Sequence, residues 1–166
     1  MALRALGQLM LALPGVTVTN HYDDKARITG ATSTPSWTIG TDAFGFSRFI
    51  TKTQDTFTRI KGQLRVKTST SRTMVDGIDG SKSITVGDIG LTGVLAIDPR
   101  QMGLEGLIQL MLALPGVTVT NHYDDKARIT GATSTPSWTI GTDPFGFNRF
   151  ITRTQDTYTR IKGQIR

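Results

Sequence analysis

The chain has 166 residues, with no cysteine and only two histidines. Without cysteine it cannot form a disulfide, a thiolate metal site or a thiol nucleophile. A chain free of disulfides is compatible with a reducing compartment. No Gly-x-Ser-x-Gly sequence and no glycine-rich phosphate loop with lysine is present. We therefore expect a non-enzymatic protein without a cofactor or a bound metal.

Long hydrophobic runs are also missing. The longest aliphatic run is Leu9 to Leu13, which recurs as Leu110 to Leu114, whereas a membrane-spanning helix needs about 20 apolar residues. The chain does not open with the basic, apolar and small-residue pattern of a signal peptide. We expect no membrane partner, and a protein that is intracellular or associated with a virion.

The main feature of the sequence is an internal duplication. Residues 1–65 (copy one) recur without a gap as residues 102–166 (copy two), and a spacer, residues 66–101, separates them. Position n of copy one corresponds to position n+101 of copy two, and Gln8 to Asp42 recurs unchanged. A 65-residue unit is near the lower size limit for an independent core. We therefore predict that the copies pack together as a pseudo-twofold pair.

Periodicity predicts an α+β fold that is mostly β. Each copy opens with a helical pattern, residues 3–13 and 103–114, which Pro-Gly ends. The alternation in residues 16–19 predicts a strand that turns at residues 22–25 into a second strand, so each copy should be a short helix followed by antiparallel hairpins. Residues 30–35 are predicted as a loop.

The spacer is not a flexible linker of the Gly/Ser kind. Residues 83–86 and 93–97 have strand character, and Asp76-Gly77 and Asp79-Gly80 are typical of turns. We expect a β-rich spacer whose strands join the sheets of the flanking copies.

The net charge of +6 is concentrated in the last third of each copy. Residues 44–65 carry five cations against Asp55 alone, which gives +4, and residues 145–166 repeat that value. A two-residue turn at Gln54-Asp55 would place the cations on one strand face around Ile50. The candidate basic face consists of Arg48, Lys52, Phe57, Arg59, Lys61, Arg65, Arg149, Arg153, Tyr158, Arg160, Lys162 and Arg166.

This basic face has two interpretations. It could bind a phosphate backbone, with the aromatic residue stacking on a base. Alternatively, it could be a solvated face whose cations deter edge aggregation, or one that meets an acidic patch on a neighbouring subunit. The protein and solvent interpretations together are favoured.

The segment His21-Tyr22-Asp23-Asp24 collects the only histidine of its copy and two carboxylates. It could bind a metal or support acid–base chemistry, most simply if His21 met His122 across a pseudo-twofold axis. Neighbouring strand residues point to opposite faces, however, and Asp-Asp-Lys is common in hairpin turns. A turn is the favoured interpretation. The hydroxyls of Thr32 to Ser36 are interpreted as loop chemistry.

The segment Phe44-Gly45-Phe46-Ser47-Arg48-Phe49 resembles the aromatic RNP1 strand of the RNA-recognition motif, whose aromatic residues stack on bases. The resemblance covers six residues in each copy, the second being residues 145–150. It departs from the family at Asp42, where a basic residue is expected, and at Ser47, where an apolar residue is expected. Core aromatic residues beside a glycine turn are the favoured interpretation.

The duplication and the missing catalytic set predict a structural or assembly protein. Two nearly equivalent modules allow n chains to supply 2n positions in a ring, shell or tube, as in a virion or tail component. The partners would be further copies of the chain or neighbouring structural subunits. The alternative is a small basic nucleic-acid-binding protein that uses the strands in residues 44–65 and 145–166.

Overall fold

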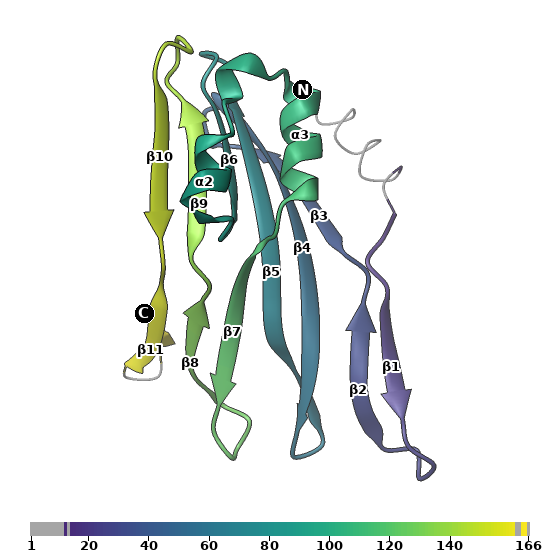
Figure 1. The fold of residues 1–166 in the computed structure, drawn as a ribbon. Coiled ribbons are helices and arrows are strands. Elements are labelled where there is room, and N and C mark those ends of the chain that lie inside the picture. Colours follow the sequence, from purple (N-terminus) through teal and green to yellow (C-terminus); the bar gives the residue numbers. More distant parts are fainter. Residues whose placement is uncertain (1–11, 13, 162–163, 166) are drawn as a thin grey trace.

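A computed structural model describes residues 12, 14–161 and 164–165. These residues form one antiparallel sheet of twelve strands with helices on one face (Figure 1), so the mostly β character of the α+β fold is confirmed. Copy one supplies β1 (Val18–Tyr22), β2 (Ile28–Ser33), β3 (Ser36–Thr41) and β4 (Ser47–Ile60). The spacer region supplies β5 (Gln63–Gly77), β6 (Lys82–Gly87), α2 (Gly90–Leu95) and η1 (Pro99–Gln101). Copy two supplies α3 (Leu104–Ala113), β7 (Val117–Tyr123), β8 (Ile129–Ser134), β9 (Ser137–Thr142), β10 (Arg149–Thr154), β11 (Thr157–Ile161) and β12 (Gln164–Ile165).

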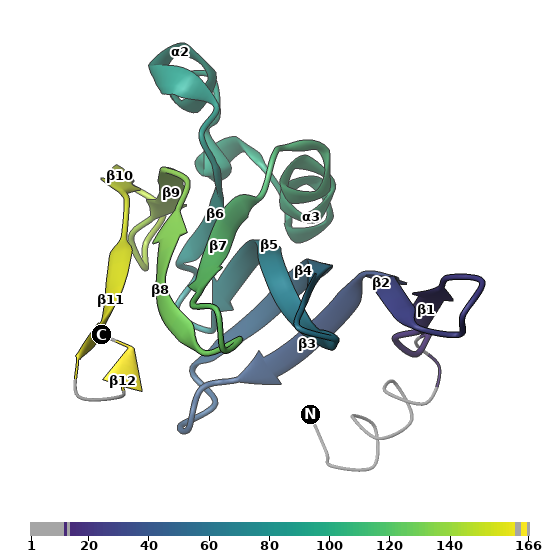
Figure 2. The ribbon, with the colours of Figure 1, turned by 90° about the horizontal axis from the view of Figure 1, so that it is seen from below.

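The sheet forks because two long strands serve two sets of neighbours. In one half the strand order is β3-β4-β5-β6-β9-β10, and in the other half it is β1-β2-β4-β5-β7-β8-β11-β12. Only β4 and β5 run through both halves. Figure 2 shows β1 and β2 at one end of the sheet and β11 and β12 at the other, with α3 beside the middle strands.

The long hairpin of β4 and β5 corrects the predicted turn at Gln54-Asp55. These two residues lie inside β4 and pair with Thr70 and Ser69 of β5. The chain reverses at Lys61-Gly62, whose φ angles of 47° and 82° are those of a type I′ hairpin turn. Because β5 offers a full-length partner, strand pairing overrides the local turn preference of Gln-Asp. The same two residues in copy two, 155–156, separate β10 from β11.

The two copies follow one another along the sheet in the same strand order. In the half that contains β6, copy one contributes β3 then β4, and copy two contributes β9 then β10. The successive pairings are all antiparallel, so β3 and β9 run in the same direction. A twofold axis would reverse the order in one copy. The predicted pseudo-twofold arrangement is therefore not confirmed. The strand order instead relates copy two to copy one by a shift along the sheet.

Cross-strand rows of like residues run across this half of the sheet. One row is apolar and lies on the face that α3 covers, and its members are Ile39, Ile50, Met74, Ile84, Ile140 and Ile151. The adjacent row points to the opposite face and consists of Thr38, Thr51, Thr73, Thr85, Thr139 and Thr152. Because side chains alternate along a strand, a register slip of one residue would exchange the two rows.

The buried core belongs to the spacer and copy two. Its buried members are Met74, Ile84, Val86, Val94, Ile97, Leu107, Met111 and Ile140. Leu107 and Met111 lie one helical turn apart on α3, as predicted for the helix of residues 103–114. The equivalent helix predicted for residues 3–13 of copy one lies, except for residue 12, outside the described residues.

Two local predictions need correction. Residues 93–97, predicted as a strand, contain the end of helix α2, which turns Val94 into the core. A short apolar run fits a buried helix as well as a strand, so periodicity alone could not separate the two. Residues 30–33, predicted as part of a loop, belong to β2, because β1 and β4 lie on either side of them. The hairpin predicted from residues 16–29 is confirmed by β1 and β2.

Identical residues are buried to different extents in the two copies. No described residue of copy one is buried, whereas Ala127, Ala132 and Ile140 of copy two are. Ile140 is 0% exposed, while its equivalent Ile39 is half-buried. The difference arises because β6 covers the outer edge of β9, and no described strand covers the outer edge of β3.

We predict that Ile140→Ala lowers the free energy of unfolding by about 3 kcal/mol, because it leaves a cavity in a packed core. Ile39→Ala should cost about 1 kcal/mol, since a half-exposed side chain loses fewer contacts. Urea unfolding followed by circular dichroism at low protein concentration measures both. Equal losses in the two variants would contradict the difference in packing.

We also predict that Gly116→Ala destabilises the fold by about 2 kcal/mol through overpacking. A Cβ at Gly116 would lie 2.6 Å from Thr70 Cγ2 and 2.9 Å from the Ser71 carbonyl oxygen, whereas one at the equivalent Gly15 meets nothing within 4 Å. Gly15→Ala is therefore the matched control and should leave the urea midpoint of the dilute protein unchanged. A loss at Gly15 as large as that at Gly116 would show that the close approach of β7 to β5 is not the cause.

Candidate functional site

The predicted basic face is divided between the two sides of the sheet. Because β4 is continuous, Arg48 and Lys52 point to the same side as Ile50, whereas Phe57 and Arg59 point to the other. The prediction that these residues share one face is wrong. It depended on the predicted turn at Gln54-Asp55, which would have made residues 48–52 and 57–61 two paired strands with their cations on one face.

Several of the predicted basic residues have partners within the chain. An Arg48 guanidinium nitrogen lies 2.5 Å from an Asp76 carboxylate oxygen, and the Lys52 ammonium lies 5.3 Å from the centre of the Trp37 ring. In copy two, Arg149 donates to the Val94 carbonyl oxygen at 2.6 Å and to that of Leu95 at 3.2 Å, at the carboxyl end of α2. These three cations therefore contact groups of the same chain.

Arg153 repeats the contact of Lys52 with a tryptophan. Its guanidinium lies 5.7 Å from the centre of the Trp138 ring, and the Trp138 indole N–H donates to Asp88 at 2.9 Å. That indole hydrogen bond and the Gly90 backbone N–H lower the pKa of the Asp88 carboxyl. A basic residue beside a tryptophan is therefore a repeated element of β3–β4 and β9–β10.

Three cations of the predicted face lie at the tip of the β4–β5 hairpin. Arg59, Lys61 and Arg65 are exposed there, and the Lys61 ammonium lies 4.0 Å from the Asp125 carboxylate. Phe57 is half-buried. In copy two, burial raises the pKa of the Tyr158 hydroxyl, as does the neighbouring Asp156. The side chains of Arg160, Lys162 and Arg166 lie outside the described part of the chain.

The histidine segments are structural turns. Asp23 accepts hydrogen bonds from the backbone N–H groups of Lys25 at 3.0 Å and Arg27 at 2.8 Å, and these contacts and the Arg27 side chain lower its pKa. His21 contacts the Thr32 hydroxyl at 3.3 Å. The strands β2, β4 and β5 separate β1 from β7, so His21 and His122 do not meet. The described residues contain no group of three metal-ligating side chains.

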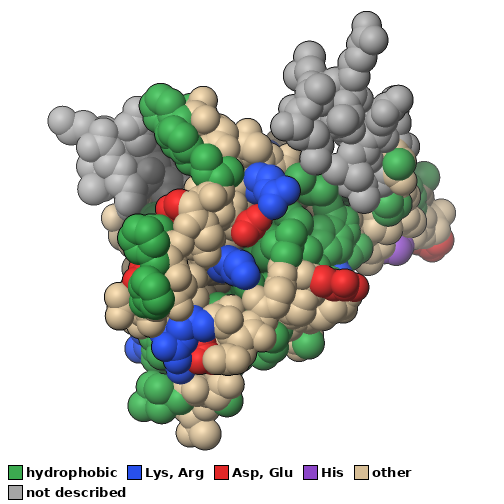
Figure 3. All heavy atoms as spheres, turned by 90° about the horizontal axis from the view of Figure 1, so that it is seen from above, with side chains coloured by type: hydrophobic (Ala, Val, Ile, Leu, Met, Phe, Trp, Pro, Cys, Tyr) green, Lys and Arg blue, Asp and Glu red, His purple; other side chains and the backbone are tan. Residues whose placement is uncertain are grey.

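The Phe-Gly-Phe segments form exposed turns, which corrects both earlier interpretations of them. Phe44 is 81% exposed and stacks on Phe46 with ring centres 6.1 Å apart, and Phe145 and Phe147 repeat the arrangement at 6.3 Å. They are neither core residues nor part of an RNP1-like strand. The Asp42 carboxylate accepts from the Phe46 N–H at 2.8 Å, and this contact helps to close the turn. Figure 3 looks onto this end of the sheet and shows hydrophobic side chains at its surface.

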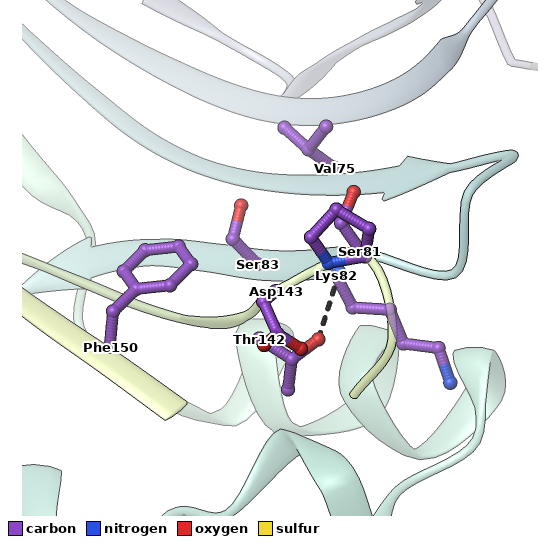
Figure 4. A pocket seen from close by; sticks show the side chains of 8 residues that line it. Val75, Ser81, Lys82, Ser83, Thr142, Asp143 and Phe150 are labelled. Carbon is purple, nitrogen blue, oxygen red and sulfur yellow. Dashed lines mark hydrogen bonds between the residues drawn. The ribbon is translucent and has the colours of Figure 1, made fainter. Parts of the chain in front are cut away.

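A shallow cavity of about 340 Å³ lies between β6 and the β9–β10 turn (Figure 4). Val75, Ser83 and Phe150 line it, and the Lys82 backbone N–H donates to the Thr142 hydroxyl at its rim. The Lys82 ammonium turns away and donates to the Met102 carbonyl oxygen at 3.3 Å. The Asp143 carboxylate accepts hydrogen bonds from Phe147 and Asn148 of its own turn. The lining thus offers no paired acid and base for catalysis.

The most distinctive surface is the open edge of copy one, formed by the outer sides of β1 and β3. Val16, Val18 and Tyr22 alternate along the β1 segment and are 54%, 51% and 61% exposed. Their equivalents in copy two are half-buried because β7 pairs with β5. There, the Tyr123 hydroxyl donates to the Val66 carbonyl oxygen at 2.6 Å. Sequence reasoning missed this surface. The signal for it was the single spacer between two copies, because one spacer cannot cover the same edge of both.

The outer side of β10 is the second open edge. Its counterpart in copy one, the first half of β4, pairs with β5 from Ser47 to Gln54. No strand in the described part of the chain pairs with the outer side of β10. Each copy therefore has two edges, and the spacer hairpin of β5 and β6 covers one edge of each (Figure 1).

No protein-family model, curated protein or solved structure matches the chain. None of the helices in the described residues combines the length and apolarity that a membrane crossing requires.

A strongly lowered pKa often indicates a functional site, but Asp98 has a structural explanation. The Arg100 side chain lowers the pKa of the Asp98 carboxyl from 3.8 to about 2. Its Nε donates to Asp98 Oδ1 at 2.9 Å, and its Nη2 donates to Asp98 Oδ2 at 2.7 Å. Asp98 also accepts from the Arg100 backbone N–H and so caps η1. The pair fixes the connection between the spacer and α3.

We predict that Asp98→Asn lowers the urea midpoint at pH 6. The difference in urea midpoint between the variant and the wild type should become smaller in acid. The folded pKa of about 2 is below the ordinary 3.8. The carboxylate therefore stabilises the fold above about pH 4 and loses this effect as the pH falls toward 2. In an Arg100→Gln background the pH dependence of the Asp98→Asn effect should largely disappear. A difference that stays constant down to pH 2 would contradict this assignment.

Proposed function

We propose that the protein is a non-enzymatic structural protein that assembles with further copies of itself through the open edges of its sheet. The observation that carries the proposal is the unequal burial of identical residues. The edge that copy two buries against β5 and β6 is open in copy one, where it presents Val16, Val18 and Tyr22 to solvent. An exposed apolar strand edge is a template for pairing with another chain.

The arrangement of the copies supports an assembly that can grow. The two open edges belong to different copies and lie at opposite ends of the sheet. A contact between unlike edges generates a ring if it closes and a filament or tube if it does not. A virion or tail component is one class of protein that needs such a subunit.

Nucleic acid binding remains the second candidate because Arg59, Lys61 and Arg65 are exposed together at one hairpin tip. It is less favoured, since Arg48, Lys52, Arg149 and Arg153 contact other groups of the chain. A phosphate backbone would have to compete with these intramolecular contacts.

We predict that light scattering coupled to size-exclusion chromatography shows a mass that rises with concentration above the 18.0 kDa monomer. Val18→Lys should weaken association by roughly tenfold or more, because it removes an apolar contact and adds a charge at the edge. Its stability as a monomer should be unchanged, since Val18 is 51% exposed. Thr29→Lys adds the same charge on the interior strand β2 and is the control.

A wild-type monomer at every concentration would contradict the assembly proposal. The same runs at low and high salt, with the ultraviolet absorbance ratio recorded, test the second candidate. A monomer that carries nucleic acid which salt removes would make nucleic acid binding the better explanation.

A further inference from the structure

The outer strands β3 and β10 are suited to pair with each other between chains. Five antiparallel pairings connect them, so β3 and β10 run in opposite directions within one chain. If a second chain is placed beside the first by translation alone, without any rotation, its β3 lies antiparallel to β10 of the first. Both chains then present their helices on the same side of the sheet.

We propose that β10 of one chain pairs with β3 of the next, so that the chains join head to tail in one continuous sheet. This inference rests on the proposed function and names its partner and register. The partner is a second copy of the same chain. The strand that would join β10 has the sequence Ser36–Thr41, which is identical to that of β9, the strand that β10 already pairs with on its inner side.

The cross-strand rows set the register of this contact. The apolar row begins at Ile39 and ends at Ile151, and the threonine row begins at Thr38 and ends at Thr152. Both rows therefore continue across the junction if Ile151 lies opposite Ile39 of the next chain. A slip of one residue would place threonine in the apolar row, which disfavours the alternative registers.

The pairs made in this register already occur in the chain. Phe49 lies opposite Gly40, and Phe150 lies opposite Gly141, where its ring approaches the position of a Cβ at 2.4 Å. At the junction Phe150 would lie opposite a second glycine, Gly40 of the next chain. Arg153 would lie opposite Trp37, which repeats the contact of a basic residue with tryptophan seen in both copies.

A twofold contact between two β10 strands fits less well. If it centred on Ile151, Arg149 of each chain would lie opposite Arg153 of the other, and like charges directly opposite each other are destabilising. In the head-to-tail register each of these arginines faces a neutral residue, Thr41 or Trp37. The charges of β10 therefore favour the edge of β3 as its partner.

The threonine row provides the test, because Thr38 and Thr152 are both exposed in the single chain. In the proposed register they lie directly opposite each other across the junction. Thr38→Lys with Thr152→Lys should raise the dissociation constant by roughly tenfold through like-charge repulsion. Thr38→Glu with Thr152→Lys should restore association to the wild-type level or beyond. Sedimentation velocity over a concentration series measures both.

A twofold contact predicts a different pattern. It would bring Thr38 near Thr38, or Thr152 near Thr152, so both double variants would place like charges together and both would be weakened. Equal weakening, or association that neither variant changes, would overturn the head-to-tail register while leaving assembly itself intact. A wild-type chain that stays monomeric would overturn both proposals. Urea unfolding of the dilute variants should show equal midpoints, which separates the interchain effect from a loss of fold.

Discussion

A β-strand has two hydrogen-bonding edges, and the rest of this structure depends on how one hairpin occupies the edges of two copies. Strand β5 pairs with β4 of copy one and with β7 of copy two, and β6 pairs with β9. The hairpin thus completes one edge of each copy and leaves the other edge of each unpaired among the described strands. Unpaired backbone groups and apolar side chains at a strand edge favour pairing with another strand. In the proposed assembly, these unpaired edges are therefore the surfaces that bring chains together.

The burial of the core follows from the same constraint. Met74, Ile84 and Val86 of the hairpin meet Leu107, Met111 and Ile140 of copy two, and α2 closes the cluster with Val94. The described residues of copy one join this core through half-buried side chains such as those of Trp37 and Ile50. Copy two and the spacer therefore form the stable centre, and copy one extends it as a sheet with one open side.

Particular elements show how far sequence reasoning reached. The helical pattern of residues 103–114 predicted α3, and the alternation before the Asp-Asp-Lys turn predicted the first hairpin of each copy. These are local properties that side-chain periodicity and turn chemistry encode. The predicted turn at Gln54-Asp55 failed because β5, which begins eight residues later, offers a long pairing partner. The predicted basic face failed with it, since its residues then lie on opposite sides of one strand.

The sequence by itself determined the duplication, the mostly β composition and the local hairpins. All of these depend on residue order and on interactions between near neighbours. Only the tertiary structure decided that the copies follow one another along a single sheet and that one copy buries the residues which the other exposes. Val18 and Val119, like Ile39 and Ile140, have identical neighbours in the chain, so no local preference can distinguish them. Their difference comes from whether the spacer hairpin lies against their strand, which is a contact between residues far apart in the sequence.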